Sequence, residues 1–370
     1  MVNDWLYELN DNINLFFENL SKGSQPYSFL PSIGGVTSSG SKLSLGFSCY
    51  ALKTYFMTGL WDNLKQNEKN EWANFINSFQ NDNLSFPPNS FLDTGYIEGF
   101  KNEQYKKILK NTAKIVSTKI GYRKFESINN QLRTFVRAET KQAISSLIQV
   151  GSFNKFPYLD FPSDNISINE FLYNLDWNRP WSAGAQYSGI CLFTKSQIDK
   201  NHHLIENLSN FSNQIVKKDT GGYYINNTPN KNELINGAMK MISGFDWIEQ
   251  KIHFPEKLID LCLDTSPSSE GCDLVDIVYV LYMCTKQTNY KKREIINYYK
   301  EIISLIKLHY YKEFYGFSYY KNKSQTHYYG VKITKGKDTP DLHGTTLLIW
   351  ALSMIIEVNE INLSWNTLKP

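Results

Sequence analysis

Two carboxylates, Asp273 and Asp276, lie at the start of an otherwise apolar segment of this 370-residue chain. Their spacing of three places both side chains on one face of a helix, because residues three or four apart are neighbours on a helix surface. Buried carboxylates in that position can act as general acid and general base. Asp273 can instead cap the helix and stabilise its positive end. We therefore treat Asp273 and Asp276 as candidate catalytic residues, with capping as the alternative role of Asp273.

His343 is the histidine best placed for proton transfer. It follows Asp341, a residue type that caps helices, and it precedes a segment that is apolar nearly all round. An imidazole in such a position can transfer protons near neutral pH, and it can equally be a satisfied structural group. His327 stands in a polar and aromatic stretch and is a second candidate. We predict that His343 is catalytic and that Asp341 and His327 contact the substrate.

A third group of polar residues, Glu233, Asn236 and Lys240, shares the first two turns of another mostly apolar segment. A lysine among apolar neighbours can bind a phosphate or carboxylate, or act as a base; alternatively, it extends its amine to solvent or to an ion pair. Glu233 is a candidate catalytic residue, and Asn236 and Lys240 are candidate substrate-binding residues. A similar cluster at 137–141 is interpreted as solvated charge.

Trp177 and Trp181 stand in one short stretch with a carboxylate and a guanidinium, Asp176 and Arg179. Such a loop can stack against a sugar or bind an isoprenoid, because an indole ring offers a large apolar face beside polar groups. The alternative is a rigid corner with buried tryptophans. Both tryptophans are predicted to bind substrate.

All these groups stand near the N-terminal ends of segments built from small and apolar residues. Six such segments occur, at 45–52, 137–143, 181–189, 233–240, 272–279 and 341–347. Amphipathic segments with one apolar face alternate with them, at 4–20, 67–80, 196–217 and 291–311. A helix that is apolar all round must be buried between other elements, whereas a one-faced helix lies at the surface. The alternation predicts paired inner and outer helices around a cavity.

The fold class that follows is all-α, an α/α toroid of about six helix pairs with a minor β-hairpin near Tyr328–Ile333. Small residues such as Gly184, Gly237 and Gly244 are expected to let the inner helices approach closely. No stretch resembles a linker between domains. We predict a single domain over 1–370, with an N-terminal helix and an ordered Gly/Ser-rich loop at about 1–44.

Two segments carry a family resemblance. Each places glycine before aromatic residues and precedes a buried helix, at 218–224 (KDTGGYY) and 314–320 (FYGFSYY). This pattern resembles the repeat of terpenoid cyclases and prenyltransferase β-subunits, and the resemblance covers roughly the C-terminal half. It implies an α/α toroid with inner helices around a deep aromatic-lined cavity. Carbohydrate-active toroids also alternate inner and outer helices.

The chain departs from that family in its chemistry. The acidic motifs of squalene-type cyclases and of diphosphate binding are absent. The surroundings of Asp276 and His343 resemble those of the prenyltransferase zinc ligands, but Val278 stands where the family has its cysteine. Asp276 and His343 are therefore carried over as cavity residues, and no metal or other cofactor is expected. Whether Cys272 joins them around a metal stays open.

Net charge, cysteine count and the distribution of apolar residues limit the kinds of protein that this chain can be. The net charge is +3, with Lys and Arg scattered, so no nucleic-acid partner is expected. The five cysteines are odd in number and form no CxxC pair, which is typical of a reducing compartment. The N-terminus lacks the pattern of a signal peptide, and no apolar run is long enough to span a bilayer. We predict a cytoplasmic protein; its richness in Lys, Asn, Ile and Tyr hints at an AT-rich genome.

Two functions remain in view. The first is an enzyme that acts on a glycan or an isoprenoid-linked substrate by general acid/base chemistry, in bacterial surface-glycan or terpenoid biosynthesis. The second is a non-catalytic binding or assembly protein that keeps the toroid without the family's catalytic motifs. Polar groups at the starts of buried helices favour the enzyme, and the missing motifs favour the binding protein.

Overall fold

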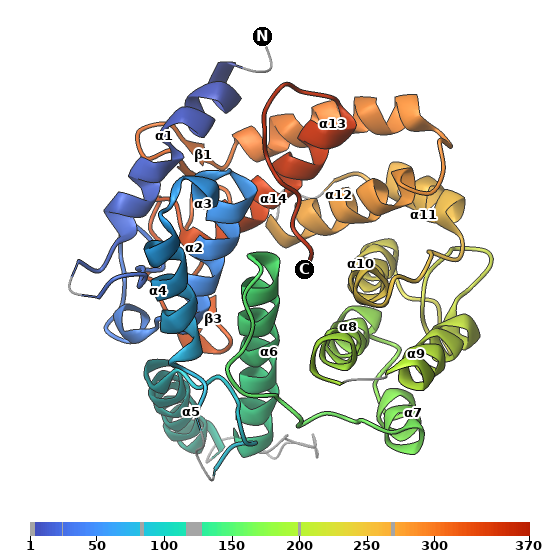
Figure 1. The fold of residues 1–370 in the computed structure, drawn as a ribbon, viewed down its shortest axis with the longest axis horizontal. Coiled ribbons are helices and arrows are strands. Elements are labelled where there is room, and N and C mark those ends of the chain that lie inside the picture. The colour runs from blue at the N-terminus through green and yellow to red at the C-terminus, as the bar shows by residue number, and fades with distance from the viewer. Residues whose placement is uncertain (1–3, 24, 82–84, 116–127, 199–200, 268–270) are drawn as a thin grey trace. The chain divides into compact units, whose positions relative to one another are not determined.

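A computed structural model describes residues 4–23, 25–81, 85–115, 128–198, 201–267 and 271–370 of the chain (Figure 1). Helices make up 59% of this part, and its strands form two short antiparallel pairs. The prediction of an all-α protein with a minor β element is confirmed at that level. The chain divides into two compact units, which are described one at a time.

Unit 1 comprises residues 1–53, 63–156 and 310–345, and unit 2 comprises 54–62, 157–309 and 346–370. The helices of unit 1 are α1 (Asp4–Leu20), η1 (Gly40–Lys42), the first part of α2 (Leu45–Met57), α4 (Gln66–Asn77), α5 (Thr94–Ile115), α6 (Ile128–Gln149) and the first turn of α14 (Leu342–Val358). Its strands are β1 (Tyr310–Tyr311), β2 (Gly316–Phe317), β3 (His327–Tyr328) and β4 (Val331–Lys332). Strand β1 pairs with β2 and β3 pairs with β4.

Unit 2 holds the remaining parts of α2 and α14 and most of the short α3 (Leu60–Asn63). Its other helices are α7 (Asn165–Tyr173), α8 (Pro180–Gln197), α9 (His202–Ile215), α10 (Lys231–Ile248), α11 (Pro255–Leu263), α12 (Gly271–Thr285) and α13 (Lys292–Lys307).

Helix α1 shows how directly the sequence sets the outer elements. Its apolar residues recur at helical spacing, and all of them are buried: Trp5, Leu6, Leu9, Ile13, Phe16, Phe17 and Leu20. The helix begins and ends at the predicted residues. In unit 1 the Trp5 ring packs against Tyr310 of β1, with ring centroids 5.2 Å apart. The periodic face therefore becomes part of the unit 1 core.

In unit 2, helix α10 packs against both α8 and α12, and α8 and α10 lie side by side (Figure 1). Contacts between α8 and α10 advance together along both helices. Near their starts the Trp181 amide donates to Glu233, midway Ser188 and Ser243 share a 2.8 Å hydrogen bond, and near their ends Lys195 contacts Glu249. Because α8 and α10 run in the same direction, the chain must return between them, and α9 (His202–Ile215) makes that return.

Glycine lets α8 and α10 approach closely, as predicted. A Cβ on Gly237 would lie 2.6 Å from the Pro180 Cβ at the start of α8, and a Cβ on Gly244 would lie 3.0 Å from the Tyr187 ring. Neither site has room for a larger side chain, because interiors are close-packed. The cost in helix propensity is thus offset by packing.

Three predicted boundaries need correction. The segment predicted at 291–311 ends as α13 at Lys307, because Tyr310 and Tyr311 leave the helix and pair as strand β1. The segment predicted at 196–217 begins too early, since Gln197 still belongs to α8 and α9 starts at His202. The segment predicted at 67–80 ends as α4 at Asn77. The hairpin predicted near Tyr328–Ile333 is confirmed as β3 and β4.

Candidate functional site

The predicted polar residues of α10 contact both neighbouring helices of unit 2, α8 and α12. Asn230 caps α10 by accepting the Glu233 amide at 2.9 Å. One oxygen of the Glu233 side chain accepts the Trp181 amide of α8 at 3.0 Å. Three positions further along α10, the Asn236 amide nitrogen donates to Asp273 of α12 at 3.1 Å. The structure therefore brings Glu233, Asn236 and Asp273 together where the starts of α8, α10 and α12 meet.

Asp276 lies one helical turn beyond Asp273 on α12 and is buried in unit 2. Only 3% of the residue is exposed, and its Oδ2 atom has no hydrogen-bond partner in the part of the chain that the structure describes. Burial raises the pKa of this carboxyl to about 6; the Lys240 amine on α10 acts in the opposite direction, and Asp273 adds to the rise. A carboxyl with a pKa near neutrality can both give and accept a proton under physiological conditions.

A small cavity adjoins this cluster. It has a volume of about 10 Å³, and Asn236, Asp273 and Ile277 are among the residues that line it. That space holds one water molecule at most. The polar seam between α10 and α12 is therefore closely packed on the side where Asn236 meets Asp273.

The two candidate tryptophans have different environments. Trp177 is 2% exposed; its indole N–H donates to the Leu172 carbonyl at 2.8 Å, and its ring packs 5.3 Å from Phe211. The Trp177 indole is therefore buried within unit 2, as the alternative of a rigid corner with buried tryptophans predicts. Trp181 is 44% exposed at the start of α8. Of the pair, Trp181 offers a surface to a ligand.

In unit 1, Asp341 organises the start of α14. Its carboxyl oxygens accept the backbone amides of Tyr319 at 2.7 Å, Gly344 at 2.8 Å and Gln325 at 3.0 Å. Burial raises the pKa of Asp341 to about 6, while these three hydrogen bonds act in the opposite direction. The carboxyl thus holds the segments at Tyr319 and Gln325 against the start of α14. Asp341 was predicted to contact substrate, and these hydrogen bonds give it a structural role.

His343 stands in the first turn of α14 between two tyrosine rings. It stacks on Tyr50 of α2, with centroids 4.5 Å apart and planes 14° from parallel, and it lies 5.1 Å from Tyr319. The residue is half-buried. The His343 ring is therefore held between two aromatic rings of unit 1.

His327 points away from these groups. It is exposed on β3 and contacts the neighbouring Thr326 hydroxyl at 3.0 Å, whereas Tyr328, the next residue, is buried. Successive side chains of a strand face opposite sides, so the two cannot share one surface. His327 therefore lies on the opposite face of β3 from Tyr328, and β3 does not place it beside His343.

Glu139 of α6 is the clearest residue that sequence reasoning missed. The prediction of solvated charge at 137–141 is wrong for this residue, which is 1% exposed. Its Oε1 accepts the Tyr328 hydroxyl at 3.1 Å, and burial raises its pKa well above the usual value, with Asp93 adding to the rise. Helical spacing held the signal, since Glu139 falls between the buried Val136 and Ala143 on one face.

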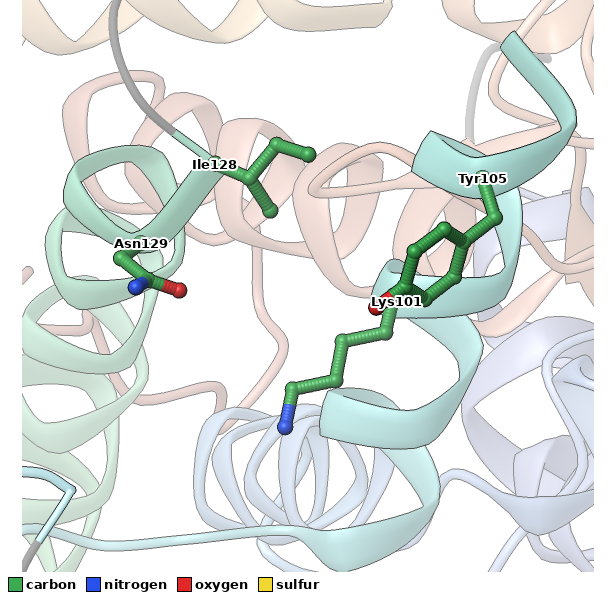
Figure 2. A pocket seen from close by; sticks show the side chains of 4 residues that line it. All are labelled: Lys101, Tyr105, Ile128 and Asn129. Carbon is green, nitrogen blue, oxygen red and sulfur yellow. The ribbon is translucent and has the colours of Figure 1, made fainter. Parts of the chain in front are cut away.

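A depression lies in unit 1 between the middle of α5 and the start of α6 (Figure 2). It has a volume of about 420 Å³ and is lined by Lys101 and Tyr105 of α5 and by Ile128 and Asn129 of α6. None of these is a carboxylate, histidine or thiol. We therefore do not assign the candidate site to this depression.

The candidate residues fall into two sets. His343, Asp341 and His327 belong to unit 1, and the remainder belong to unit 2: Asp273, Asp276, Glu233, Asn236, Lys240, Trp177 and Trp181. Within the described residues, no three or more His, Cys, Asp or Glu side chains gather as they would around a metal ion.

Comparison of the chain with protein-family models, curated proteins and solved structures finds no significant match in any of the three. Among the residues that the structure describes, no helix combines the length and apolarity needed to cross a bilayer.

Proposed function

We propose that this protein is a cytoplasmic enzyme that acts on a glycan or an isoprenoid-linked substrate by general acid/base chemistry, with Asp276 as the group that carries the proton. The observation that supports it is the Asp276 carboxyl, which is buried, has one oxygen without a hydrogen-bond partner among the described residues, and lies near Lys240. A carboxyl in this state is poised to exchange a proton rather than to hold a structural partner.

The neighbouring residues would divide the work. In its protonated form Asp276 would donate to a leaving oxygen of the substrate, and the resulting carboxylate would be stabilised by the Lys240 ammonium. Asn236 would hold Asp273 in place through their 3.1 Å hydrogen bond, so that the negative charge of Asp273 stays one turn from Asp276. Trp181, exposed at the start of α8, would offer its ring to an apolar chain or a sugar face.

The fold class belongs to the same proposal. The contacts of α10 with α8 and α12, with α9 and α11 between them in the chain, support a toroid built from alternating inner and outer helices. We propose that the whole chain is such an α/α toroid of about six pairs. The resemblance to terpenoid cyclases and prenyltransferase β-subunits is the reason for naming isoprenoid-linked substrates beside glycans.

A ligand screen followed by product analysis tests the function. Wild-type protein would be mixed with polyprenyl diphosphates and with bacterial oligosaccharides, and melting temperature and product masses would be recorded. We expect one class to raise the melting temperature and to be converted. Asp276→Asn should bind the same ligand without converting it. Asp246→Asn is the matched control, because Asp246 is a half-buried carboxyl on α10 that contacts Lys369 instead.

Turnover by Asp276→Asn at the wild-type rate would contradict the assignment. A second function, a non-catalytic binding or assembly protein, is favoured by the small cavity of about 10 Å³ beside Asp273, which leaves little room for a substrate. That alternative predicts a ligand that raises the melting temperature of wild type and Asp276→Asn alike, with no product from either.

A further inference from the structure

The segment of unit 1 that carries the β3–β4 hairpin concentrates positive charge. Residues 321–337 contain no Asp or Glu and five of the 39 Lys and Arg of the chain: Lys321, Lys323, Lys332, Lys335 and Lys337. The rest of the chain has the other 34 Lys and Arg against 36 Asp and Glu, a net charge of −2 compared with +3 for the whole. Although Lys and Arg are scattered along the sequence as a whole, the excess positive charge is therefore local.

Three of these lysines gather around two glycines. A Cβ on Gly35 would lie 3.0 Å from the Lys337 Cγ and 3.6 Å from the Lys335 Cβ. A Cβ on Gly336 would lie 2.9 Å from the Lys323 Cε. The side chains of Lys323, Lys335 and Lys337 therefore cross one small area of unit 1, and all three are exposed.

Backbone hydrogen bonds hold these lysines in place. The Ser324 amide donates to the Lys337 carbonyl at 2.8 Å, next to Lys323. The Lys335 amide donates to the Gly35 carbonyl, also at 2.8 Å. Two strands of chain and the Gly/Ser-rich loop are thus joined where the three ammonium groups leave the surface.

The other two lysines flank this group. Lys332 is paired with His327 across β3 and β4, and both side chains are exposed. Directly opposite residues of an antiparallel pair lie on the same side, so His327 and Lys332 are neighbours. Lys321 is exposed in the turn between Tyr320 and Lys323. We call the five lysines of residues 321–337 the lysine patch.

The lysine patch has no anionic partner of its own. None of its five members forms an ion pair with a described residue, whereas Lys312 of the same unit contacts Glu8 at 3.1 Å. Asp338, the carboxylate that directly follows the segment, instead accepts a hydrogen bond from the Tyr311 hydroxyl. Like charges that are held close together repel, and an anion from outside the chain removes that cost.

We propose that the lysine patch docks the protein on the anionic headgroups of a lipid bilayer. Lysine is a point charge that needs no fixed partner geometry, and the headgroups of a bilayer are mobile anions spread over a surface. Nucleic-acid surfaces favour arginine, which binds phosphates and bases in a bidentate manner, and exposed aromatic rings that stack on bases. The segment contains no arginine, and its Tyr328 ring is 3% exposed.

This inference agrees with the proposed function and does not depend on it. An isoprenoid-linked substrate would be held in a bilayer, and the cytoplasmic leaflet carries a negative surface potential. Docking is measured without any substrate, and Asp276 takes no part in it. Failure of one proposal therefore leaves the outcome of the other to its own experiment.

Vesicle flotation tests the docking surface. The full chain is mixed with phosphatidylcholine vesicles with or without phosphatidylserine, and the bound fraction gives a partition constant. We expect binding to the anionic vesicles alone, weakening steeply as salt rises from about 0.1 M to about 0.5 M. The triple variant Lys323→Gln/Lys335→Gln/Lys337→Gln should lower the partition constant about fivefold for each lysine, roughly a hundredfold in total.

The matched control removes the same charge elsewhere. Lys251→Gln/Lys292→Gln/Lys307→Gln changes three exposed lysines of unit 2 and should bind anionic vesicles as wild type does. Melting temperatures of both triple variants should equal that of wild type, because only exposed side chains change.

Three outcomes would overturn the proposal. The first is absence of wild-type binding to anionic vesicles at low salt. The second is an equal loss of binding in the two triple variants, which would show that net charge alone matters. The third is tighter binding of a DNA or RNA oligonucleotide than of anionic vesicles, lost in the patch variant, which would assign the lysine patch to nucleic acid instead.

Discussion

The Tyr328 hydroxyl donates a 3.1 Å hydrogen bond to the buried Glu139 carboxyl, across 189 positions of the chain. The hydroxyl occupies the space where a Cβ on Gly46 would lie, so α2 has glycine at the point where the tyrosine passes. The Tyr328 ring is surrounded by Phe47, with centroids 5.4 Å apart, and by other aromatic rings of unit 1. A short hairpin thus supplies the polar partner of a helix in the interior.

Tyr328→Phe should lower the free energy of unfolding by about 1–3 kcal/mol, because Glu139 would lose a hydrogen bond while remaining buried. Glu139→Gln should cost less, since the amide oxygen can still accept from Tyr328 and resembles the protonated carboxyl. Urea denaturation at neutral pH measures both. Equal stability of Tyr328→Phe and wild type would show that the hydrogen bond contributes nothing.

The Asp276 carboxyl should make wild-type stability depend on pH. Its pKa is about 6 when folded and about 3.9 when unfolded, so the folded state holds a proton that the unfolded state releases between these values. The free energy of unfolding should therefore fall as the pH rises from about 4 to about 6, and it should stay lower above that range.

Asp276→Asn should lack this contribution and be more stable than wild type at neutral pH by about 1–3 kcal/mol. Urea denaturation curves of both proteins, recorded at intervals from about pH 4 to about pH 7, give the difference. Two stability profiles that run parallel over the whole range would contradict the raised pKa. A gain in stability combined with loss of turnover is typical of a functional residue.

Asp341→Ala should be strongly destabilising, because three backbone amides, of Tyr319, Gln325 and Gly344, lose their acceptor. We expect a loss of about 2–4 kcal/mol. His327→Ala is the matched control from the same unit; its side chain is exposed, and the change should stay within about 0.5 kcal/mol. Thermal melts of the two variants beside wild type suffice. Similar melting temperatures for both variants would show that the three hydrogen bonds accepted by Asp341 do not stabilise the fold.

Gly237→Ala should destabilise unit 2 by about 1–3 kcal/mol, although alanine is the better helix former. The added Cβ would lie 2.6 Å from Pro180, whose ring cannot move away easily. Gly184→Ala should cost less, since the nearest neighbour of its added Cβ, the Lys240 Cβ, lies at 3.0 Å rather than 2.6 Å. Chemical denaturation ranks the two variants. The reverse order would show that α8 and α10 have room to separate at Pro180.

Some elements followed from local pattern alone. The face of α1 could be read from its apolar spacing because every contact it makes in the core is made by that one stripe. The same holds for the starts of α10 and α12, where Asn236 and Asp273 were predicted to be important without a known partner. The helix period depends only on near neighbours in sequence, which is why it is visible there.

Other features depend on residues far apart in the sequence. Trp177 and Trp181 look equivalent in one short stretch, yet only the packing of Phe211 against Trp177 determines which ring is buried. The sequence pattern predicted solvated charge for Glu139, whereas in the structure Tyr328 of the β3–β4 hairpin donates a hydrogen bond to it in the interior. Burial and pKa are properties of the surroundings, and those are assembled from distant segments. The sequence alone therefore determined which polar residues stand at helix starts, and the tertiary structure decided which of them lose contact with water.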